Sequence, residues 1–203
     1  MMLDNKYEED PKNPDSLPSL NPFLNKKLLE TRTVLIFGEI NMELAQRVSS
    51  ELLILAHSSP QPINVIINSP GGHVESGDTL YDFLRFIDVP VNVIGTGWVA
   101  SAGALIFLGG KKNRRFVLPN TRFLLHQPLG GMQGKALDIK IQAEEIIKMR
   151  ERINSIIAKE TGNPIEKVRA ETERDFWLSA EEGIQYGLAH RVITSLKDLP
   201  SVS

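Results

Sequence analysis

The stretch INVIINSPGGHVESGDTLYDFLRFI, residues 63–87, decides the fold class that the sequence predicts. Its first five residues form an apolar run interrupted only by Asn64, which is typical of a buried strand. The turn-forming residues 68–72 include two adjacent glycines and lead into a helix expected over 75–87. A strand that runs directly into a helix is the repeating unit of parallel α/β sheets.

The same strand-then-helix order recurs along the chain. A strand over 33–37 is expected to end at Gly38-Glu39, and Asn41 is expected to cap the next helix. A strand over 91–94 leads through the glycines of 95–97 into a helix that begins near Ser101. The other expected elements are a helix over 42–56, strands over 116–118, 123–125 and 176–178, a short helix from Pro164, and a helix with a capping box of Ser179 and Glu182 that ends at Gly187. Together they predict an α/β domain with a mostly parallel sheet covered by helices.

Residues 135–159 interrupt this order with one long helical pattern, preceded by the glycine-rich segment 129–134. A helix of about 25 residues is about 37 Å long, which is more than a domain of this size needs. Two interpretations remain open: a projection that packs on another copy of the protein, or a surface helix of the same domain.

Composition restricts the class of protein and of partner. With 203 residues, 41% hydrophobic and 24% charged, the chain is typical of a globular domain. A net charge of −2 gives no reason to expect nucleic acid or an acidic membrane as a partner. The absence of cysteine excludes disulfides and thiolate metal sites, and neither a metal nor a cofactor is expected.

The first 22 residues are polar and carry four prolines, which predicts a flexible arm. The expected organisation is an arm and short entry segment over 1–30, then one domain over 31–203. The arm lacks the apolar centre of a secretory signal, and no apolar stretch approaches the roughly 20 residues that cross a bilayer. The expected location is the cytoplasm.

His126 is the histidine best placed for chemistry. It ends the apolar strand around 123–125 and precedes Gln127-Pro128, where the chain must leave the sheet. Strand ends are where α/β sheets form sites, although the pattern alone favours a core histidine with satisfied hydrogen bonds. The other histidines have simpler roles, a helix end for His57, a cleft wall for His73 and a solvated position for His190.

Ser101 is a lone hydroxyl in the small apolar run ASAG, residues 100–103. A serine at a helix start is commonly a cap or a packing residue. The alternative is a nucleophile lifted out at the end of the sheet, beside free N–H groups of the helix start. The segment 68–72 also allows two interpretations. It is either a tight turn or a loop that presents an N–H to a substrate carbonyl.

Five motifs in this order resemble ClpP, the proteolytic subunit of the Clp protease, a serine peptidase family. They are INSPGG 67–72, ASAG 100–103, RFVLPN 115–120, HQPLGG 126–131 and RDFWLSA 174–180, within a resemblance that covers residues 33–193. The resemblance implies a ClpP/crotonase-like spiral of βα units with a protruding handle over 129–160. It also leaves room for a divergent second paralogue.

The resemblance implies a catalytic triad of Ser101 as nucleophile, His126 as general base and Asp175 as orienting carboxylate. A serine hydroxyl needs an imidazole to take its proton, and a buried carboxylate fixes that imidazole. The oxyanion donors would be the backbone N–H groups of Gly72 and Ala102. The family usually has methionine at the position of Ala102. Because the donor is a main-chain N–H, alanine can serve in its place.

The resemblance also implies how substrate and other subunits are held. An extended substrate would lie between two segments, with contacts to Gly72, His73, Val74, Leu129 and Gly130. The handle would join two stacked heptameric rings, and an AAA+ unfoldase of the ClpX, ClpA or ClpC type would use ATP and deliver unfolded proteins. Glu171 and Arg174 resemble the acid–arginine pair at the ring–ring contact, where the family acid is usually aspartate.

Two departures from the family accompany these motifs. The family's N-terminal axial-loop segment is not recognisable in residues 1–30. Asn64 and Thr96 replace apolar residues in the expected unfoldase pocket, so docking would be weakened and a mixed barrel with a paralogue becomes an option. The rival hypotheses are a catalytically inactive structural subunit and an enzyme of the enoyl-CoA hydratase/isomerase group.

Overall fold

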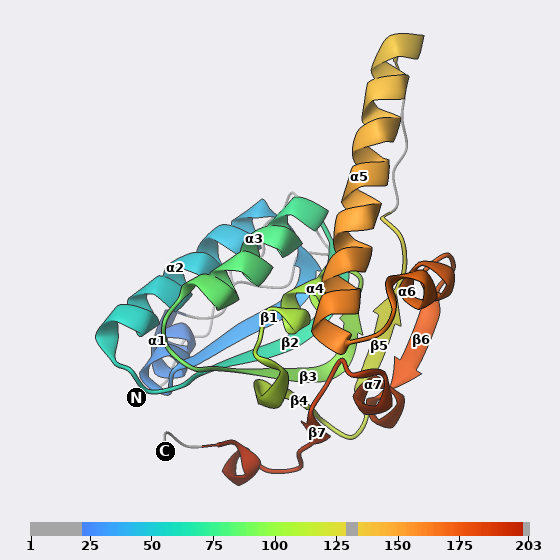
Figure 1. Ribbon diagram of the computed structural model, residues 1–203. Coiled ribbons are helices and arrows are strands. Elements are labelled where there is room, and N and C mark those ends of the chain that lie inside the picture. The colour runs from blue at the N-terminus through green and yellow to red at the C-terminus, as the bar shows by residue number, and fades with distance from the viewer. Residues whose placement is uncertain (1–21, 129–133, 201–203) are drawn as a thin grey trace, which may run out of the picture.

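The computed structural model describes residues 22–128 and 134–200, which form a sheet covered by helices (Figure 1). Five of the seven described strands pair in parallel along one path: β1 (Thr33–Ile40), β2 (Ile63–Gly72), β3 (Val91–Ala100), β4 (Arg115–Val117) and β7 (Arg191–Val192). Off this path, β5 (Arg122–Leu125) pairs in parallel with β3, and β6 (Phe176–Ser179) pairs antiparallel with β5. The predicted α/β class with a mostly parallel sheet is confirmed.

The described residues contain seven α-helices, of which the first precedes the first strand and the other six lie between strands. They are α1 (Pro22–Glu30), α2 (Met42–Ser58), α3 (Val74–Phe86), α4 (Ala102–Leu108), α5 (Ala136–Thr161), α6 (Ile165–Glu171) and α7 (Ala180–Tyr186). Figure 1 shows α2 and α3 side by side over the sheet, with α4 between the sheet and α5. All seven residues of α4 are buried, as expected for a helix that is apolar on every side.

The local signals at helix ends behave as predicted. The Asn41 side chain accepts a hydrogen bond from the N–H of Leu44 at 2.8 Å. Ser179 and Glu182 form the expected capping box, and Gly187 ends α7 with a φ of 92°. These side chains act on their own turn of helix, so the sequence alone specifies them.

Three strands are longer than predicted, because glycines were interpreted as strand ends. β1 continues past Gly38, and β2 and β3 include the expected turns at 68–72 and 95–97. The register of β1 against β2 shifts between Phe37 and Glu39, as at a β-bulge. A glycine inside a strand marks such a bulge as readily as an end, so the predicted boundaries were wrong.

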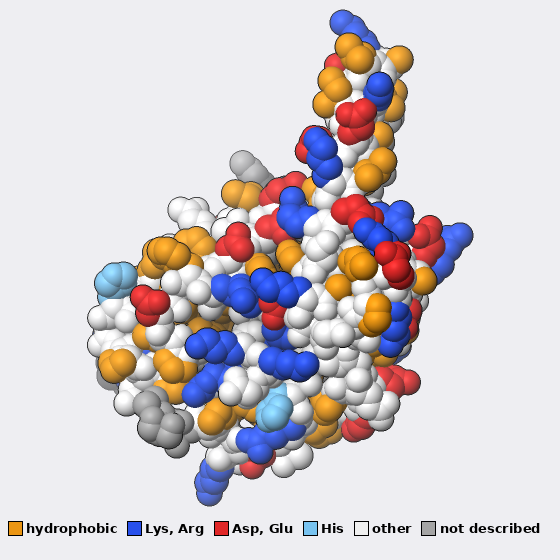
Figure 2. Space-filling view, in the orientation of Figure 1, with side chains coloured by type: hydrophobic (Ala, Val, Ile, Leu, Met, Phe, Trp, Pro, Cys, Tyr) orange, Lys and Arg blue, Asp and Glu red, His pale blue; other side chains and the backbone are white. Residues whose placement is uncertain are grey.

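The long helix α5 projects from the body of the protein (Figure 1). Its buried residues, Asn154, Ile157 and Thr161, all lie in its second half. In its first half, Leu137 and Ile147 are 68% and 60% exposed, and hydrophobic side chains run along the projection (Figure 2). The first half therefore does not lie on its own domain, and the interpretation as a plain surface helix is wrong there. The predicted arm and residues 129–133 lie outside the described residues.

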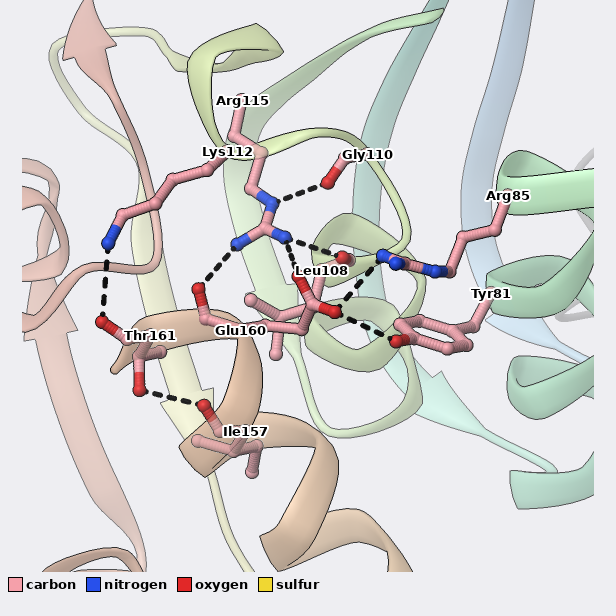
Figure 3. Close-up of polar contacts among 9 residues, drawn as sticks. All are labelled: Tyr81, Arg85, Leu108, Gly110, Lys112, Arg115, Ile157, Glu160 and Thr161. Atoms are coloured by element: carbon pink, nitrogen blue, oxygen red, sulfur yellow. Dashed lines mark hydrogen bonds and ion pairs between the residues drawn. The ribbon is translucent and has the colours of Figure 1, made fainter. Parts of the chain in front are cut away.

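A buried ion pair fixes the second half of α5 to the body (Figure 3). The Arg115 side chain is fully buried and donates to the carbonyl oxygens of Gly110 and Leu108, both at 2.8 Å, and to the Glu160 carboxylate. Glu160 also accepts from Arg85 at 3.0 Å and from the Tyr81 hydroxyl at 3.1 Å. Burial raises the pKa of Tyr81 to about 12, so the phenol stays protonated as a donor.

Replacing Glu160 by alanine is expected to destabilise the fold by about 3–5 kcal/mol, because it leaves a buried guanidinium without its carboxylate. The measurement is chemical denaturation followed by far-UV circular dichroism. Glu145→Ala is the control, since the Glu145 carboxylate is 63% exposed and, among the described residues, pairs with Lys148 alone. An equal and small change in both variants would contradict the role given to the Arg115–Glu160 pair.

Candidate active site

The sheet topology brings the three predicted triad residues to one edge. Ser101 follows the last residue of β3, and His126 follows the last residue of β5. Asp175 precedes the first residue of β6, which runs antiparallel to β5. Because β3 and β5 are parallel, the ends of two strands and the start of the third meet. Residues up to 74 positions apart in sequence are therefore collected by strand pairing alone.

The backbone of Ser101 is strained. Its φ of 53° is positive, which is uncommon for a residue with a side chain. Its N–H donates to the carbonyl oxygen of Leu124 in β5 at 2.9 Å, and its side chain makes no capping hydrogen bond to α4. The interpretation of Ser101 as a simple helix cap is therefore wrong. Strain of this kind accumulates at functional sites.

Ser101 and His126 line the same cavity. The remaining lining is mostly apolar and comes from Val74, Ala102, Leu105, Leu125, Pro128, Ile153 and Ile157. The His126 side chain is 18% exposed, so it is not a fully buried core histidine. A hydroxyl and an imidazole thus share a pocket whose other walls are mostly apolar.

Asp175 contacts the His126 ring at one nitrogen. Its Oδ1 lies 3.3 Å from Nδ1, and among the described residues Nε2 has no carboxylate partner. The Asp175 side chain is 65% exposed, whereas the triad pattern led us to expect a buried carboxylate. Within residues 22–128 and 134–200 no hydrogen bond joins the Ser101 hydroxyl to the imidazole. Such bonds commonly tighten only when substrate binds.

Two glycines at the end of β2 shape the space beside Ser101. Gly71 and Gly72 have φ values of 103° and 145°. A Cβ on Gly71 would lie 2.6 Å from the Cβ of Ser101, and one on Gly72 would lie 2.3 Å from the carbonyl oxygen of Ile40. The sequence indicated the glycine pair but not that Gly71 packs on the serine, because that contact depends on strand register.

The predicted substrate-binding residues have different positions. Val74 lines the cavity with Ser101. The side chain of His73 caps α3 by accepting from the N–H of Ser76 at 3.3 Å, and its Nε2 lies 3.3 Å from Glu75. His73 was predicted to line a cleft. In the structure its side chain caps helix α3 and does not line the cavity of Ser101. Leu129 and Gly130 lie outside the described residues.

The two residues predicted to form oligomer contacts, Glu171 and Arg174, do not pair with each other in the described part of a single chain. Glu171 accepts a hydrogen bond from the Tyr186 hydroxyl at 2.7 Å, and Arg174 is exposed. Glu173, which sequence reasoning passed over, accepts from Gln127 at 2.9 Å and from Arg150 at 2.8 Å. It therefore links the residue after His126, helix α5 and the segment before Asp175. The role of Glu171 and Arg174 between copies stays a prediction.

The remaining histidines take no part in the cavity lining. The Nδ1 of His57 lies 2.8 Å from the carbonyl oxygen of Leu53, as expected at a helix end, and His190 is exposed beside the Phe116 ring. In the described part of the chain, no group of three or more acidic, histidine or cysteine side chains is arranged to hold a metal. None of the described helices combines the length and apolar character that spanning a membrane requires.

The comparisons with known proteins agree on one family. The family model described as "Clp protease" matches residues 22–196. The "ATP-dependent Clp protease proteolytic subunit 2" of Gluconobacter oxydans is 59% identical, over 87% of this chain and 80% of that protein. Subunit 3 of Rhizobium etli is 54% identical, over 96% of this chain and 100% of that protein. The solved structure of a point mutant of ClpP1 from Listeria monocytogenes matches with a TM-score of 0.80 and 52% identity, over 86% of this chain and 98% of that chain.

Replacing Gly71 by alanine is expected to slow the reaction of Ser101 with a fluorophosphonate by about 10²-fold, because the added methyl group displaces the serine. The measurement is the rate of covalent labelling followed by mass spectrometry. Gly162→Ala is the matched control, since Gly162 also has a positive φ, 84°, but nothing lies within 4 Å of an added Cβ. Equal labelling of the two variants would show that the Gly71 contact does not position Ser101.

Proposed function

The chain belongs to the Clp protease family as a proteolytic subunit, and we propose that it cleaves peptide bonds through Ser101, His126 and Asp175. The family and the named relatives establish a peptidase. The same comparisons exclude the alternative that the chain is an enzyme of the enoyl-CoA hydratase/isomerase group. The observation that supports the proposed triad is the shared cavity of Ser101 and His126, with the Asp175 carboxylate 3.3 Å from Nδ1 of the His126 ring.

In the proposed reaction, the Ser101 oxygen attacks the substrate carbonyl carbon while His126 Nε2 takes the hydroxyl proton. Asp175 stabilises the resulting imidazolium. The negative oxygen of the tetrahedral intermediate is held by the N–H groups of Gly72 and Ala102. The C–N bond breaks as His126 returns the proton to the amine. A water molecule then gives its proton to His126 and attacks the ester carbonyl of the acyl-enzyme. The C–O bond to Ser101 breaks as His126 returns the proton to the serine oxygen, which releases the carboxylic acid and free Ser101.

The proposed substrate is an unfolded protein bound in extended form. The end of β2, residues 72–74, and the segment around Leu129 and Gly130 would pair with its main chain. Main-chain pairing is indifferent to most side chains, which suits degradation of many sequences. The apolar walls contributed by Leu105, Ile153 and Ile157 favour an apolar side chain next to the cleaved bond.

The proposed assembly is two stacked heptameric rings in the cytoplasm. Its support in this chain is the exposed first half of α5, where an apolar surface has no cover from its own domain. A second copy of the helix would bury Leu137, Ile139, Ile141 and Ile147. ATP would be used by a partner unfoldase and not by this subunit.

Docking of that unfoldase is proposed to be weak. We assign the docking site to a buried apolar cluster of Ile94, Phe116 and Ile193, against which Ile66 and Leu118 pack. Next to it, Asn64 accepts from Asn92 at 2.9 Å, and Asn92 accepts from Arg114 at 2.7 Å. Asn92 is already buried, so a partner would desolvate the half-buried ends of this polar chain, Asn64 and Arg114, which is costly. A mixed barrel with a more apolar paralogue would supply the missing affinity.

The triad predicts that a fluorophosphonate labels the assembled wild-type protein and not the Ser101→Ala variant. Asp175→Asn is expected to lower kcat for a peptide substrate by about 10³–10⁴-fold, because His126 loses its orienting carboxylate. Size-exclusion chromatography controls for assembly of each variant. A wild type that remains unlabelled in every assembly state would identify the chain as an inactive structural subunit instead.

The docking proposal predicts that the pure homo-oligomer captures a Clp-type AAA+ unfoldase more weakly than a mixed assembly does. The measurement is a pull-down with ATP, alongside degradation of a folded reporter protein. Asn64→Leu should strengthen capture, since it replaces one member of the polar chain by an apolar side chain. Processive degradation of the reporter by the homo-oligomer with unfoldase alone would refute weak docking.

A further inference from the structure

Both tryptophans of the sequence meet beside the candidate active site. The rings of Trp98 in β3 and Trp177 in β6 have centroids 5.9 Å apart. The Arg122 guanidinium of β5 lies 4.4 Å from the centroid of the Trp177 ring, in cation–π contact. We call Trp98, Arg122 and Trp177 the tryptophan stack.

The stack lies on the face of the sheet opposite the core. Val99 and Phe123 are register partners, as are Phe123 and Leu178, and these three side chains are 0–7% exposed. Because successive side chains of a strand point to opposite faces, the neighbours Trp98, Arg122 and Trp177 point outward. Trp98 is 47% exposed, so the stack is not part of the core.

Each strand of the stack carries one triad residue at its end. Ser101 follows Trp98 by three residues, His126 follows Arg122 by four, and Asp175 precedes Trp177 by two. In the described sheet, β6 pairs with β5 alone, so its backbone is held from one side. The Trp98–Trp177 contact reaches across β5 and is the side-chain link from β6 to β3 on this face.

We propose that Trp98, Arg122 and Trp177 are positioning residues that hold the start of β6, and with it Asp175, against His126. The proposal rests on the proposed triad. Asp175 is largely exposed and contacts the ring at 3.3 Å, so its placement depends on where β6 begins. The stack does not contribute to the cavity lining, which comes from other residues of α3, α4, α5 and the β5 end. Its loss should therefore lower kcat and leave KM nearly unchanged.

The test uses the full-length assembled protein and a short fluorogenic peptide. Trp177→Leu is expected to lower kcat about tenfold with KM within about twofold, because the aromatic contact is lost. Trp177→Phe should restore most of the rate, since it returns a ring to the stack. Arg122→Gln, at an exposed position, should lower kcat without loss of folding. Arg191→Gln is the matched control: Arg191 is also exposed and lies 5.5 Å from the Phe116 ring centroid, but its strand β7 pairs with β4 and with none of the three triad strands.

A double-mutant cycle with Asp175→Asn decides between positioning and general stabilisation. If the stack acts through Asp175, Trp177→Leu costs about tenfold in the wild type and almost nothing in the Asp175→Asn background. Equal losses in both backgrounds, no rescue by phenylalanine, or no loss for Arg122→Gln would overturn the inference. An Asp175→Asn variant as active as wild type would instead refute the proposed triad itself, so the two failures are distinguishable.

Discussion

One residue must turn the chain from strand β3 into helix α4, because Ala100 ends the strand and Ala102 begins the helix. Ser101 makes this turn at a φ of 53°, and the missing side chain of Gly71 provides the space for it. The turn directs the hydroxyl away from a capping role and leaves the first N–H groups of α4 without helical partners. In the proposed mechanism, the nucleophile and one oxyanion donor are two results of the same turn.

The other end of α4 is fixed by charge. The Leu108 carbonyl at its last residue accepts from the buried Arg115, whose carboxylate partner Glu160 belongs to α5. Ile157, one turn before Glu160, lines the cavity with Ser101. A buried ion pair is a costly way to gain stability, but it defines a single geometry. Here that geometry sets the distance between the serine helix and the apolar wall opposite it.

Local chemistry made part of this structure predictable. Apolar runs indicated the buried strands, and Asn41 and Ser179 identified their helix starts, since each acts within one turn. Strand ends at glycines were misjudged, because a bulge and a terminus look alike in one sequence. Asp175 was identified only through the family resemblance. Its side chain is exposed and distant in sequence from Ser101, and only the pairing of β5 with β6 brings it near.

The acid of the proposed triad is held from both sides along its own segment. On one side, Glu173 bonds to Gln127 next to His126 and to Arg150 of α5. On the other side, Trp177 contacts Trp98 of the strand that ends at Ser101. An exposed carboxylate has no buried hydrogen bonds to fix it, so its neighbours in sequence must do so. Since one of these neighbours contacts α5, a movement of that projecting helix would reach His126, the proposed base, through Glu173 and Gln127.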